Sequence, residues 1–458
     1  MGFRSCWWLV DAFLVLAGCG GGGMSSSPPS VPGQATVDFN STYQTIRGFG
    51  GSTAWLGALT TQQAAALFSP TGGLGLSILR VRIDPEGSPN SSPPYVTGEW
   101  AAELTNAIEE HSENPNAIVF ATPWTPPPAM KISSTSQPFW SGSPACGTGS
   151  PGSNYCGGYL NPSDYTAYAN YLEDFVTYFA NNGIKLYGIS MQNEPDYADV
   201  DFESCYWTPQ QMDTWVAQLT ANGATNPIAT KLIMPESFRF NPAQSDPTLN
   251  DPRAVNNVSI VGGHLYGVSP SFYATARNLG KEIWMTEHYF KPAGAEPAIG
   301  DALSMAEEIH NGMTVGDYNA YVWWWIWDAG INYGLINSST ASPAPTYYGF
   351  AIGQFSKFIQ PGFVRVSATA SPVAGVYLSA YSYSGSLSYP YHYVIVAINS
   401  NAASETLSFT LDHASNVAAL TPYETTPAGG LMKQSAVDVP NGQFTYSLPA
   451  QSIVTFAQ

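Results

Sequence analysis

Short apolar runs of strand length recur along most of the chain, and patterns with helical spacing lie between most of them. The candidate strands are Arg47–Gly51, Ile78–Ile83, Ala117–Thr122, Leu186–Met191, Lys231–Met234, Ser259–Leu265, Glu282–Thr286 and Ala320–Ile326. Apolar runs without polar alternation are typical of parallel strands that are buried on both faces. Eight such strands alternating with helices predict an α/β fold, a (β/α)8 TIM barrel over residues 46–361.

An open, doubly wound sheet is the alternative arrangement of alternating strands and helices. Such a sheet would be expected to carry a glycine-rich nucleotide loop after its first strand. The stretch Gly48-Phe-Gly-Gly51 contains no G-x-G-x-x-G pattern, which favours the barrel.

The clearest helical pattern covers Ser163–Asn182. Its apolar side chains recur three and four residues apart and form one face, which contains Tyr168, Tyr171, Leu172, Phe175, Val176 and Phe179. Ser163 is the expected N-cap of this helix. Gly183 can adopt the left-handed conformation that ends it.

The pattern changes after Phe363, where apolar and polar residues alternate. The clearest alternating runs are Tyr393–Ile398, Thr406–Leu411 and Ser452–Phe456. Such alternation is typical of antiparallel strands with one buried face, so we predict a side β-sandwich over residues 362–458. Residues 35–40 alternate as well, and we expect residues 35–45 to supply an N-terminal strand to this sandwich.

The N-terminus has the features of an export signal. Arg4 precedes an apolar run over residues 6–16, and Leu16-Ala-Gly-Cys19 resembles a bacterial lipobox. We therefore predict a lipoprotein-type signal peptide over 1–18, a lipid anchor on Cys19 and a flexible linker over 19–34. Asp11 interrupts the apolar run, so a cleaved secretory signal is the alternative. The expected location is the bacterial cell surface or outer membrane, or the medium.

Composition excludes several classes of partner. Charged residues make up only 10% of the 458 residues, and the formal net charge is −18. Nucleic acid is not expected, because a phosphate backbone requires basic patches. No later stretch is long and apolar enough for a transmembrane helix, so the lipid anchor is the only expected membrane contact. No His or Cys spacing predicts a metal site, and we expect a monomer without a cofactor.

Three cysteines follow the signal, namely Cys146, Cys156 and Cys205. An exported protein meets an oxidising compartment, where disulfides form. Cys146 and Cys156 flank a Gly/Ser/Asn-rich loop, so we expect them to pair and Cys205 to be free. Three pairings exist, and the sequence does not decide between them.

Carboxylates follow two of the predicted barrel strands. Glu194 follows Leu186–Met191, and Glu287 follows Glu282–Thr286. Reactive groups of parallel barrels project from the C-terminal ends of the strands. Two carboxylates facing each other across a cleft can hydrolyse a glycoside, and in a retaining enzyme they lie about 5–5.5 Å apart. A simple turn is the alternative at Glu194, because Asn, Pro and Asp beside it are common turn residues.

Other residues near these strand ends suit sugar binding. Asn193 could hydrogen-bond a sugar 2-hydroxyl, and Arg80, on the same face of its strand as Arg82, could hold Glu287 ionised. A structural salt bridge is the alternative for the two arginines. Flat rings stack on sugar C–H faces. Aromatic residues at the predicted strand ends could do so or could belong to the core, and they are Trp55, Trp124, Tyr266, Tyr289, Trp323, Trp324, Trp325 and Trp327.

Six ordered motifs between Ile46 and the C-terminus are specific enough to compare with a known family. They are Gly48-Phe-Gly-Gly-Ser52, Thr122-Pro-Trp-Thr-Pro-Pro127, Met191-Gln-Asn-Glu-Pro-Asp196, Gly263-His-Leu-Tyr-Gly267, Trp284-Met-Thr-Glu-His-Tyr289 and Phe355-Ser-Lys-Phe-Ile-Gln-Pro-Gly-Phe-Val-Arg-Val366. Together they resemble glycoside hydrolase family 30, and in particular its bacterial xylanases. The resemblance implies a (β/α)8 barrel, a side β-sandwich built from both chain ends, and a retaining mechanism on xylan or xylooligosaccharides.

The resemblance also implies roles for single residues. Glu194 matches the acid/base and Glu287 the nucleophile. The expected sugar contacts in the −1 and neighbouring subsites are Trp124, Asn193, Tyr266, Tyr289 and Trp324. Tyr197 lies where relatives often stack an aromatic ring, and Trp55 and Arg80 complete the expected substrate-binding set.

This sequence departs from the family pattern in two places. Glucuronoxylan-specific relatives carry W-W-Y-I-R-R after the last barrel strand, and the second Arg grips the glucuronate carboxylate. Here the run is Trp323-Trp-Trp-Ile-Trp-Asp328. Because an anion repels a carboxylate, we expect no dependence on glucuronic acid branches. Long loops over 131–159 and 197–207 could block one end of the cleft, which would give partly exo action and short products such as xylobiose.

The leading hypothesis is a retaining β-1,4-xylanase or a xylobiose-releasing relative. Other family activities are alternatives, among them β-1,6-glucanase, β-1,6-galactanase and β-glucosidase. A non-catalytic sugar-binding lipoprotein is a further alternative from a different class. Intact Glu194 and Glu287 disfavour it, because a binding protein needs neither acid nor nucleophile.

Overall fold

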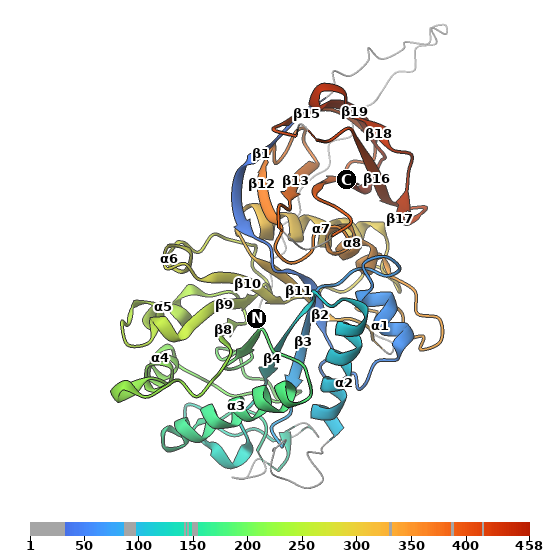
Figure 1. Cartoon of the computed structure of the whole chain (residues 1–458). Helices are drawn as coiled ribbons and strands as arrows, with labels where there is room; N and C mark the ends of the chain where they lie inside the picture. The colour runs from blue at the N-terminus through green and yellow to red at the C-terminus, as the bar shows by residue number, and fades with distance from the viewer. Residues whose placement is uncertain are drawn as a thin grey trace, which may run out of the picture. The chain divides into compact units, whose positions relative to one another are not determined.

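The computed structural model describes residues 33–86, 98–141, 143, 146–148, 154–328, 332–385, 389–414 and 416–458 (Figure 1). The predicted signal peptide over 1–18, the lipid anchor at Cys19 and the linker up to residue 32 lie outside these residues. Within the described part of the chain, no helix combines the length and the apolar character that crossing a membrane requires.

Eight parallel strands close into a barrel, with each strand hydrogen-bonded to its two neighbours. This confirms the predicted TIM barrel, and each of the eight predicted runs overlaps one of its strands. In the order around the barrel they are β10 (Glu282–Glu287), β11 (Ala320–Trp325), β2 (Gly48–Ser52), β3 (Ile78–Ile83), β4 (Ile118–Pro123), β7 (Gly188–Ser190), β8 (Lys231–Ser237) and β9 (Val258–His264).

Helices connect successive barrel strands and cover the barrel (Figure 1). They are α1 (Thr61–Phe68), α2 (Gly98–Glu113), α3 (Tyr165–Asn181), α4 (Pro209–Gln218), α5 (Pro242–Asn250), α6 (Ala274–Asn278), α7 (Ile299–Thr314) and α8 (Tyr347–Ser356). The predicted apolar face of α3 is buried. Ser163 does not cap this helix, because a single turn of 3-10 helix precedes α3 and Asn161 caps that turn through a 3.2 Å bond from the Ser163 amide. Gly183 has a left-handed φ of 85°, as expected.

The lower part of the barrel interior, towards the N-terminal ends of the strands, is apolar. The upper part, towards their C-terminal ends, is polar. Seven buried side chains from six strands fill the lower part, namely Ile78, Phe120, Ile233, Ile260, Trp284, Ala320 and Val322. Further along the same strands the buried side chains are Arg80, Thr122, Glu236 and His264. On these four strands the change from apolar to polar residues places the buried polar side chains at the C-terminal end of the barrel.

A second, mixed sheet of ten strands accompanies the barrel. Its N-terminal strand β1 (Gly33–Thr45) pairs antiparallel with β12 (Val364–Ala368) and parallel with β15 (Glu405–Asp412). The remaining strands are β13 (Val376–Ser382), β14 (Tyr393–Asn399), β16 (Ala419–Thr426), β17 (Gly429–Lys433), β18 (Val437–Asp438), β19 (Gln443–Leu448) and β20 (Ser452–Ala457). The predicted side sandwich therefore includes an N-terminal strand, and this strand starts two residues before the expected Ala35. Because β1 lies between β12 and β15, its hydrogen bonds make the sheet continuous.

Buried hydrogen bonds connect helix α8 of the barrel to this sheet. The Thr455 hydroxyl donates to the Gln354 carbonyl at 2.7 Å, and the Gln354 amide donates to the Thr425 hydroxyl at 2.8 Å. Buried polar groups destabilise a fold unless they are paired, so these bonds fix the sheet against the barrel.

Gly50 on β2 tests the packing on which barrel closure depends. A Cβ atom at this position would lie 1.8 Å from the Ile78 carbonyl oxygen, a backbone atom that cannot move without disturbing β3. We expect Gly50→Ala to lower the free energy of unfolding by roughly 3 kcal/mol. Gly300→Ala is the matched control, since Gly300 lies in α7 and a Cβ atom there would have nothing within 4 Å. Chemical denaturation of both variants measures the difference, and equal effects would contradict this account.

Candidate active site

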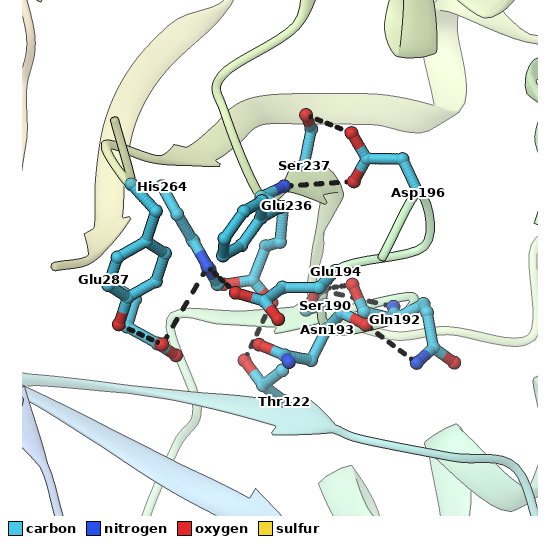
Figure 2. Close-up of polar contacts among 12 residues, drawn as sticks. Thr122, Ser190, Gln192, Asn193, Glu194, Asp196, Glu236, Ser237, His264 and Glu287 are labelled. Atoms are coloured by element: carbon cyan, nitrogen blue, oxygen red, sulfur yellow. Dashed lines mark hydrogen bonds and ion pairs between the residues drawn. The ribbon is translucent and has the colours of Figure 1, made fainter. Parts of the chain in front are cut away.

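Glu194 and Glu287 come together at the C-terminal end of the barrel, although they lie on different strands. Glu287 is the last residue of β10, and Glu194 follows β7 with a left-handed φ of 46°. One carboxylate oxygen of each residue and one ring nitrogen of His264 all lie within 4.8 Å of one another. Figure 2 shows the contacts that join both carboxylates to His264. Both side chains are buried.

Two donors hold Glu287. Arg80 on β3 forms an ion pair with Oε2, and the Tyr266 hydroxyl donates to Oε1 at 2.7 Å. Arg80 is fully buried; burial lowers its pKa, but the charges of Glu236 and Glu287 outweigh burial and raise it. A permanent cation and a phenol donor at this position stabilise a negative charge on Glu287.

Glu194 has a different environment. Burial raises the pKa of its carboxyl group to about 7, with a further contribution from the negative charge of Glu287, and the 2.8 Å contact with His264 Nδ1 opposes this rise. The two carboxyl groups therefore have different environments. Glu194 can carry a proton near neutral pH, whereas Glu287 is held by the Arg80 cation. Such a pair is the usual arrangement for acid and nucleophile.

His264 and Glu236 complete the buried charges of the site. Burial lowers the pKa of His264, but Glu287, Glu194 and Glu236 outweigh it and raise the pKa to about 9. For Glu236 on β8, burial raises the pKa, but Arg80 and His264 outweigh it and lower the value to about 2. At neutral pH His264 is therefore an imidazolium and Glu236 a carboxylate.

Arg80 also orients Asn193. Its Nη2 donates to the Asn193 side-chain oxygen at 2.7 Å, and the Asn193 backbone amide donates to the Pro123 carbonyl at 2.8 Å. Both ends of Asn193 are thereby fixed beside Glu194. The Arg80 guanidinium also lies 4.6 Å from the centre of the Trp124 ring.

Five of the predicted aromatic residues form two groups, one that contacts Arg80 through Trp124 and Trp324 and one that contacts Glu287 through Tyr266, whereas Trp323 lies in the core. Trp55, Trp124 and Trp324 contact one another at ring distances of 4.9, 5.7 and 6.0 Å. Tyr266 and Tyr289 lie 5.6 Å apart. The structure adds two rings that the sequence did not single out: Phe238, which stacks on Tyr266 at 5.1 Å, and Tyr333, which lies 4.6 Å from Tyr289.

Tyr197 lies at the outer end of the second group. Its ring stacks on Phe238 at 4.2 Å with an angle of 13° between the ring planes, and 39% of the residue is exposed. An exposed, supported ring is the form of a sugar platform. The expected contact at Tyr197 is therefore compatible with its position.

The two long loops beside the site are fastened to each other. Cys146 and Cys156 form a disulfide, and Cys205 is a free, buried cysteine, both as expected. The buried Lys131 ammonium donates to the Thr125 hydroxyl at 2.7 Å and to the Ser204 carbonyl at 2.9 Å. Burial lowers the pKa of Lys131 to about 8. These contacts tie the described parts of the 131–159 loop to the 197–207 loop.

Arg82 contacts the 197–207 loop. It forms ion pairs with Glu203 of the 197–207 loop and, at 3.7 Å, with Asp84, and its guanidinium lies 4.9 Å from the Trp55 ring centre. The salt-bridge alternative for the arginine pair therefore describes Arg82, whereas Arg80 contacts Glu287.

The sequence did not identify His264 and Glu236 as site residues. Glu236 follows the apolar run Lys231–Met234, the same pattern that singled out Glu194 and Glu287. His264 ends β9 and belongs to the motif Gly263-His-Leu-Tyr-Gly267. The rule that polar residues at barrel strand ends are functional would have found both.

Glu194, His264 and Glu287 also have the separations of a candidate metal site. The chemistry of the three groups does not suit a cation. A metal ion would have to displace the proton that the neighbouring carboxylates favour on His264, and Glu287 already pairs with the Arg80 guanidinium. These groups therefore fit proton transfer and nucleophilic attack better than metal ligation.

Comparison with known proteins gives a consistent set of relatives. A sequence model of the glycosyl hydrolase family 30 TIM-barrel domain matches residues 103–281. Glucuronoxylanase XynC of Bacillus subtilis strain 168 is 36% identical over 433 residues, which cover 92% of this chain and 90% of the relative. The chain belongs to glycoside hydrolase family 30.

Solved structures agree with this assignment. The family 30 subfamily 8 xylanase Xyn30A from Clostridium acetobutylicum is 42% identical with a TM-score of 0.78, and the match covers 93% of this chain and 99% of that one. Family 30 xylanase C from Talaromyces cellulolyticus is 26% identical with a TM-score of 0.71 and the same coverage. The predictions of a glycoside hydrolase and of a barrel with a side sheet are confirmed.

The raised pKa of Glu194 makes stability depend on pH. The folded hydrolase holds this proton up to a pH of about 7, whereas the unfolded chain releases it near the ordinary value of 4.5. The folded state therefore binds more protons in this window, and stability falls as pH rises through it. Relative to wild type, we expect the free energy of unfolding of Glu194→Gln to be higher at pH 8 than at pH 4 by roughly 1–3 kcal/mol.

Urea denaturation at pH 4, 6 and 8 measures this difference. The matched control is Glu296→Gln, because Glu296 is exposed and its replacement should shift stability equally at each pH. If the difference in unfolding free energy between Glu194→Gln and wild type does not change with pH, the raised pKa of Glu194 is contradicted.

Proposed function

We propose that this family 30 hydrolase cleaves β-1,4-xylosidic bonds in xylan or xylooligosaccharides by double displacement. The observation that carries the proposal is the approach of two buried carboxylates from β7 and β10 to within 4.8 Å, near the roughly 5–5.5 Å expected between the carboxyl groups of a retaining enzyme. The similarity to a Bacillus glucuronoxylanase and to clostridial and fungal xylanases supports xylan as substrate.

In the first step Glu287 attacks the anomeric carbon of the −1 sugar while the glycosidic C–O bond breaks. Glu194 gives its proton to the departing oxygen, which leaves as a hydroxyl group. In the second step Glu194 takes a proton from water, and that water releases the sugar from Glu287 with the original anomeric configuration. A carboxyl pKa of about 7 suits Glu194 to both proton transfers.

The remaining predicted residues bind the sugar. Asn193, fixed by Arg80, would hydrogen-bond the 2-hydroxyl, and Tyr266 would hold the nucleophile. The tryptophan group would line one side of the −1 subsite. Tyr289 and Tyr197 belong to the opposite aromatic group, and Tyr197 is exposed enough to stack on a neighbouring sugar unit. The chain would act without a cofactor and as a monomer.

We propose further that cleavage does not depend on glucuronic acid branches. The sequence from Trp323 to Gly334 contains no Arg or Lys that could bind a carboxylate. Asp328 accepts hydrogen bonds from the backbone amides of Asn332 at 2.9 Å, of Tyr333, and of Gly334 at 2.8 Å. Its charge is therefore largely engaged within the chain, so the missing cation carries this proposal more than repulsion by Asp328.

The two fastened loops support partly exo action. Lys131, the disulfide and the Arg82–Glu203 pair give the described loop segments a fixed conformation close to Trp55. A fixed wall at one end of a cleft limits the number of sugar units that fit beyond it. Short products such as xylobiose are the consequence we propose.

Replacing the nucleophile tests the catalytic assignment. We expect Glu287→Gln to lower kcat on xylan by roughly 10⁴-fold, because no covalent intermediate can form. Glu282→Gln is the matched control, since Glu282 begins the same strand and pairs with Arg47 and Lys231 at its other end. Reducing-sugar release measures both variants. Equal release by wild type and Glu287→Gln would favour a sugar-binding protein or another nucleophile.

Product analysis tests the finer specificity. We expect similar rates on glucuronoxylan, arabinoxylan and linear xylooligosaccharides of equal length, because the sequence from Trp323 to Gly334 supplies no cation for a uronic acid. Mass spectrometry of the digests should show short, unbranched products among them. Cleavage confined to bonds next to glucuronosyl residues would refute independence of the branch, and activity on β-1,6-glucan or β-1,6-galactan alone would replace xylan as the substrate.

A further inference from the structure

Glu236 is a third buried carboxylate at the mouth of the barrel, and the proposed reaction does not use it. It lies on β8, its side chain is fully buried, and its φ of 56° is left-handed. Left-handed conformations destabilise non-glycine residues and persist where surrounding contacts enforce them, often at functional sites. Burying a charged carboxylate also requires partners.

The partners of Glu236 come from the neighbouring strands. Oε2 accepts a hydrogen bond from the Thr122 hydroxyl of β4 at 2.9 Å. Oε1 lies 3.3 Å from Arg80 Nη2 of β3 and 3.9 Å from His264 Nε2 of β9. Ser190 of β7 further lowers the pKa of Glu236. Within the described residues, Arg80 and His264 are the cations that face Glu236, and Figure 2 shows Glu236 between His264 and Thr122.

Each of these two cations also contacts a carboxylate of the proposed catalytic pair. Arg80 forms its other ion pair with Glu287, and His264 Nδ1 contacts Glu194 at 2.8 Å. Glu236 therefore lies behind both cations, on the side away from the reacting groups. If Glu236 and Glu287 are ionised, the charges of Arg80 and His264 balance them only while Glu194 carries its proton.

A backbone contact links Glu236 to the acid/base as well. The Glu194 amide donates to the Glu236 carbonyl at 3.0 Å, and both residues have left-handed backbone conformations. The position of the Glu194 side chain thus depends on the conformation of β8 at Glu236.

We propose that Glu236 is a positioning residue that anchors Arg80 against Glu287 and His264 against Glu194. The proposal rests on the catalytic roles proposed above for Glu194 and Glu287. Glu236 touches neither the substrate nor the reacting atoms. It acts by keeping two buried cations in place and charged, so that the nucleophile remains ionised and the acid carries its proton in the resting enzyme.

The alternative is that Glu236 only stabilises the barrel. A purely structural role would change the unfolding free energy but would alter neither the titration of His264 nor the balance between kcat and KM. These readouts therefore decide between the two roles.

The titration of His264 is the first test, and it needs no substrate. With ¹⁵N-labelled histidine, NMR follows the ring nitrogens, and the spectrum of His264→Gln identifies the His264 signal among the six histidines. We expect His264 to remain an imidazolium through neutral pH in wild type. In Glu236→Gln its titration midpoint should fall by about one pH unit or more, because a facing anion is lost.

Kinetics on two classes of substrate form the second test. We expect Glu236→Gln to lower kcat on xylooligosaccharides by roughly 10–100-fold with little change in KM, as for a misplaced reacting group. A dinitrophenyl xylobioside releases dinitrophenolate, which departs without being protonated. On it, kcat/KM of Glu194→Gln should recover towards wild type, whereas that of Glu236→Gln should remain low, because Arg80 no longer fixes Glu287.

Glu110→Gln is the matched control. Glu110 is a fully buried carboxylate on α2 that contacts His111, so the same substitution there should leave the His264 midpoint and kcat unchanged. Glu236→Asp keeps the charge and serves if Glu236→Gln does not fold. It should keep His264 protonated at neutral pH but lower kcat, because its shorter side chain moves the carboxylate away from Arg80. Wild-type kcat in this variant would also contradict the anchoring role.

The outcomes separate this proposal from the proposed function. An unchanged His264 midpoint in both Glu236 variants, or wild-type kcat in Glu236→Gln, overturns the anchoring role. Inactivity of the wild type on every xylan substrate overturns the proposed function, while the His264 titration still judges the contacts of Glu236.

Discussion

The ion pairs of Arg80 are the constraint on which the active site depends. A fully buried guanidinium destabilises a fold strongly unless anions and hydrogen-bond acceptors surround it. Here Glu236, Glu287, Asn193 and Thr122 supply them from four different parts of the barrel rim. Each partner is held in place because the cation requires it, so one buried charge orders Glu287, the proposed nucleophile, and the neighbouring Asn193. The contacts that offset the desolvation of Arg80 therefore also preorganise the site.

This arrangement requires a rigid support beneath it. The apolar side chains of the lower barrel, among them Phe120 and Trp284 at a ring distance of 5.6 Å, exclude water from the lower side of Arg80. Gly50 allows β2 to approach β3 closely at the same level. A low dielectric below the charges strengthens these ion pairs. Burial raises the pKa of both Glu194 and Glu236. At Glu194 burial and the charge of Glu287 outweigh the contact with His264, whereas at Glu236 Arg80 and His264 outweigh burial and lower the pKa.

The sequence predicted the strands and the two principal carboxylates because both follow local rules. Apolar runs of strand length mark buried parallel strands, and a carboxylate directly after such a run lies at the rim. The same rule applies to Glu236, which follows the run Lys231–Met234, but its contacts with Arg80 and His264 come from other strands and cannot be read from that run. The pairing of Arg80 with Glu287 and of Arg82 with Glu203 depends on barrel closure and on a distant loop, which no local pattern encodes. Ser163 illustrates the same limit at short range, since Asn161 caps the preceding turn instead.

The rim around Asp328 shows how the structure changes a charge argument. From the sequence, an acidic residue in place of an arginine predicts repulsion of a uronic acid. In the structure the Asp328 carboxylate accepts hydrogen bonds from three successive backbone amides, which offset much of its field. Exposed charges more than about 8–10 Å away are screened at physiological salt, so the net charge of −18 adds little at the cleft. Recognition of a branch carboxylate by ion pairing would need a cation within contact distance, and the absence of Arg and Lys from residues 323–334 is therefore the stronger part of the argument.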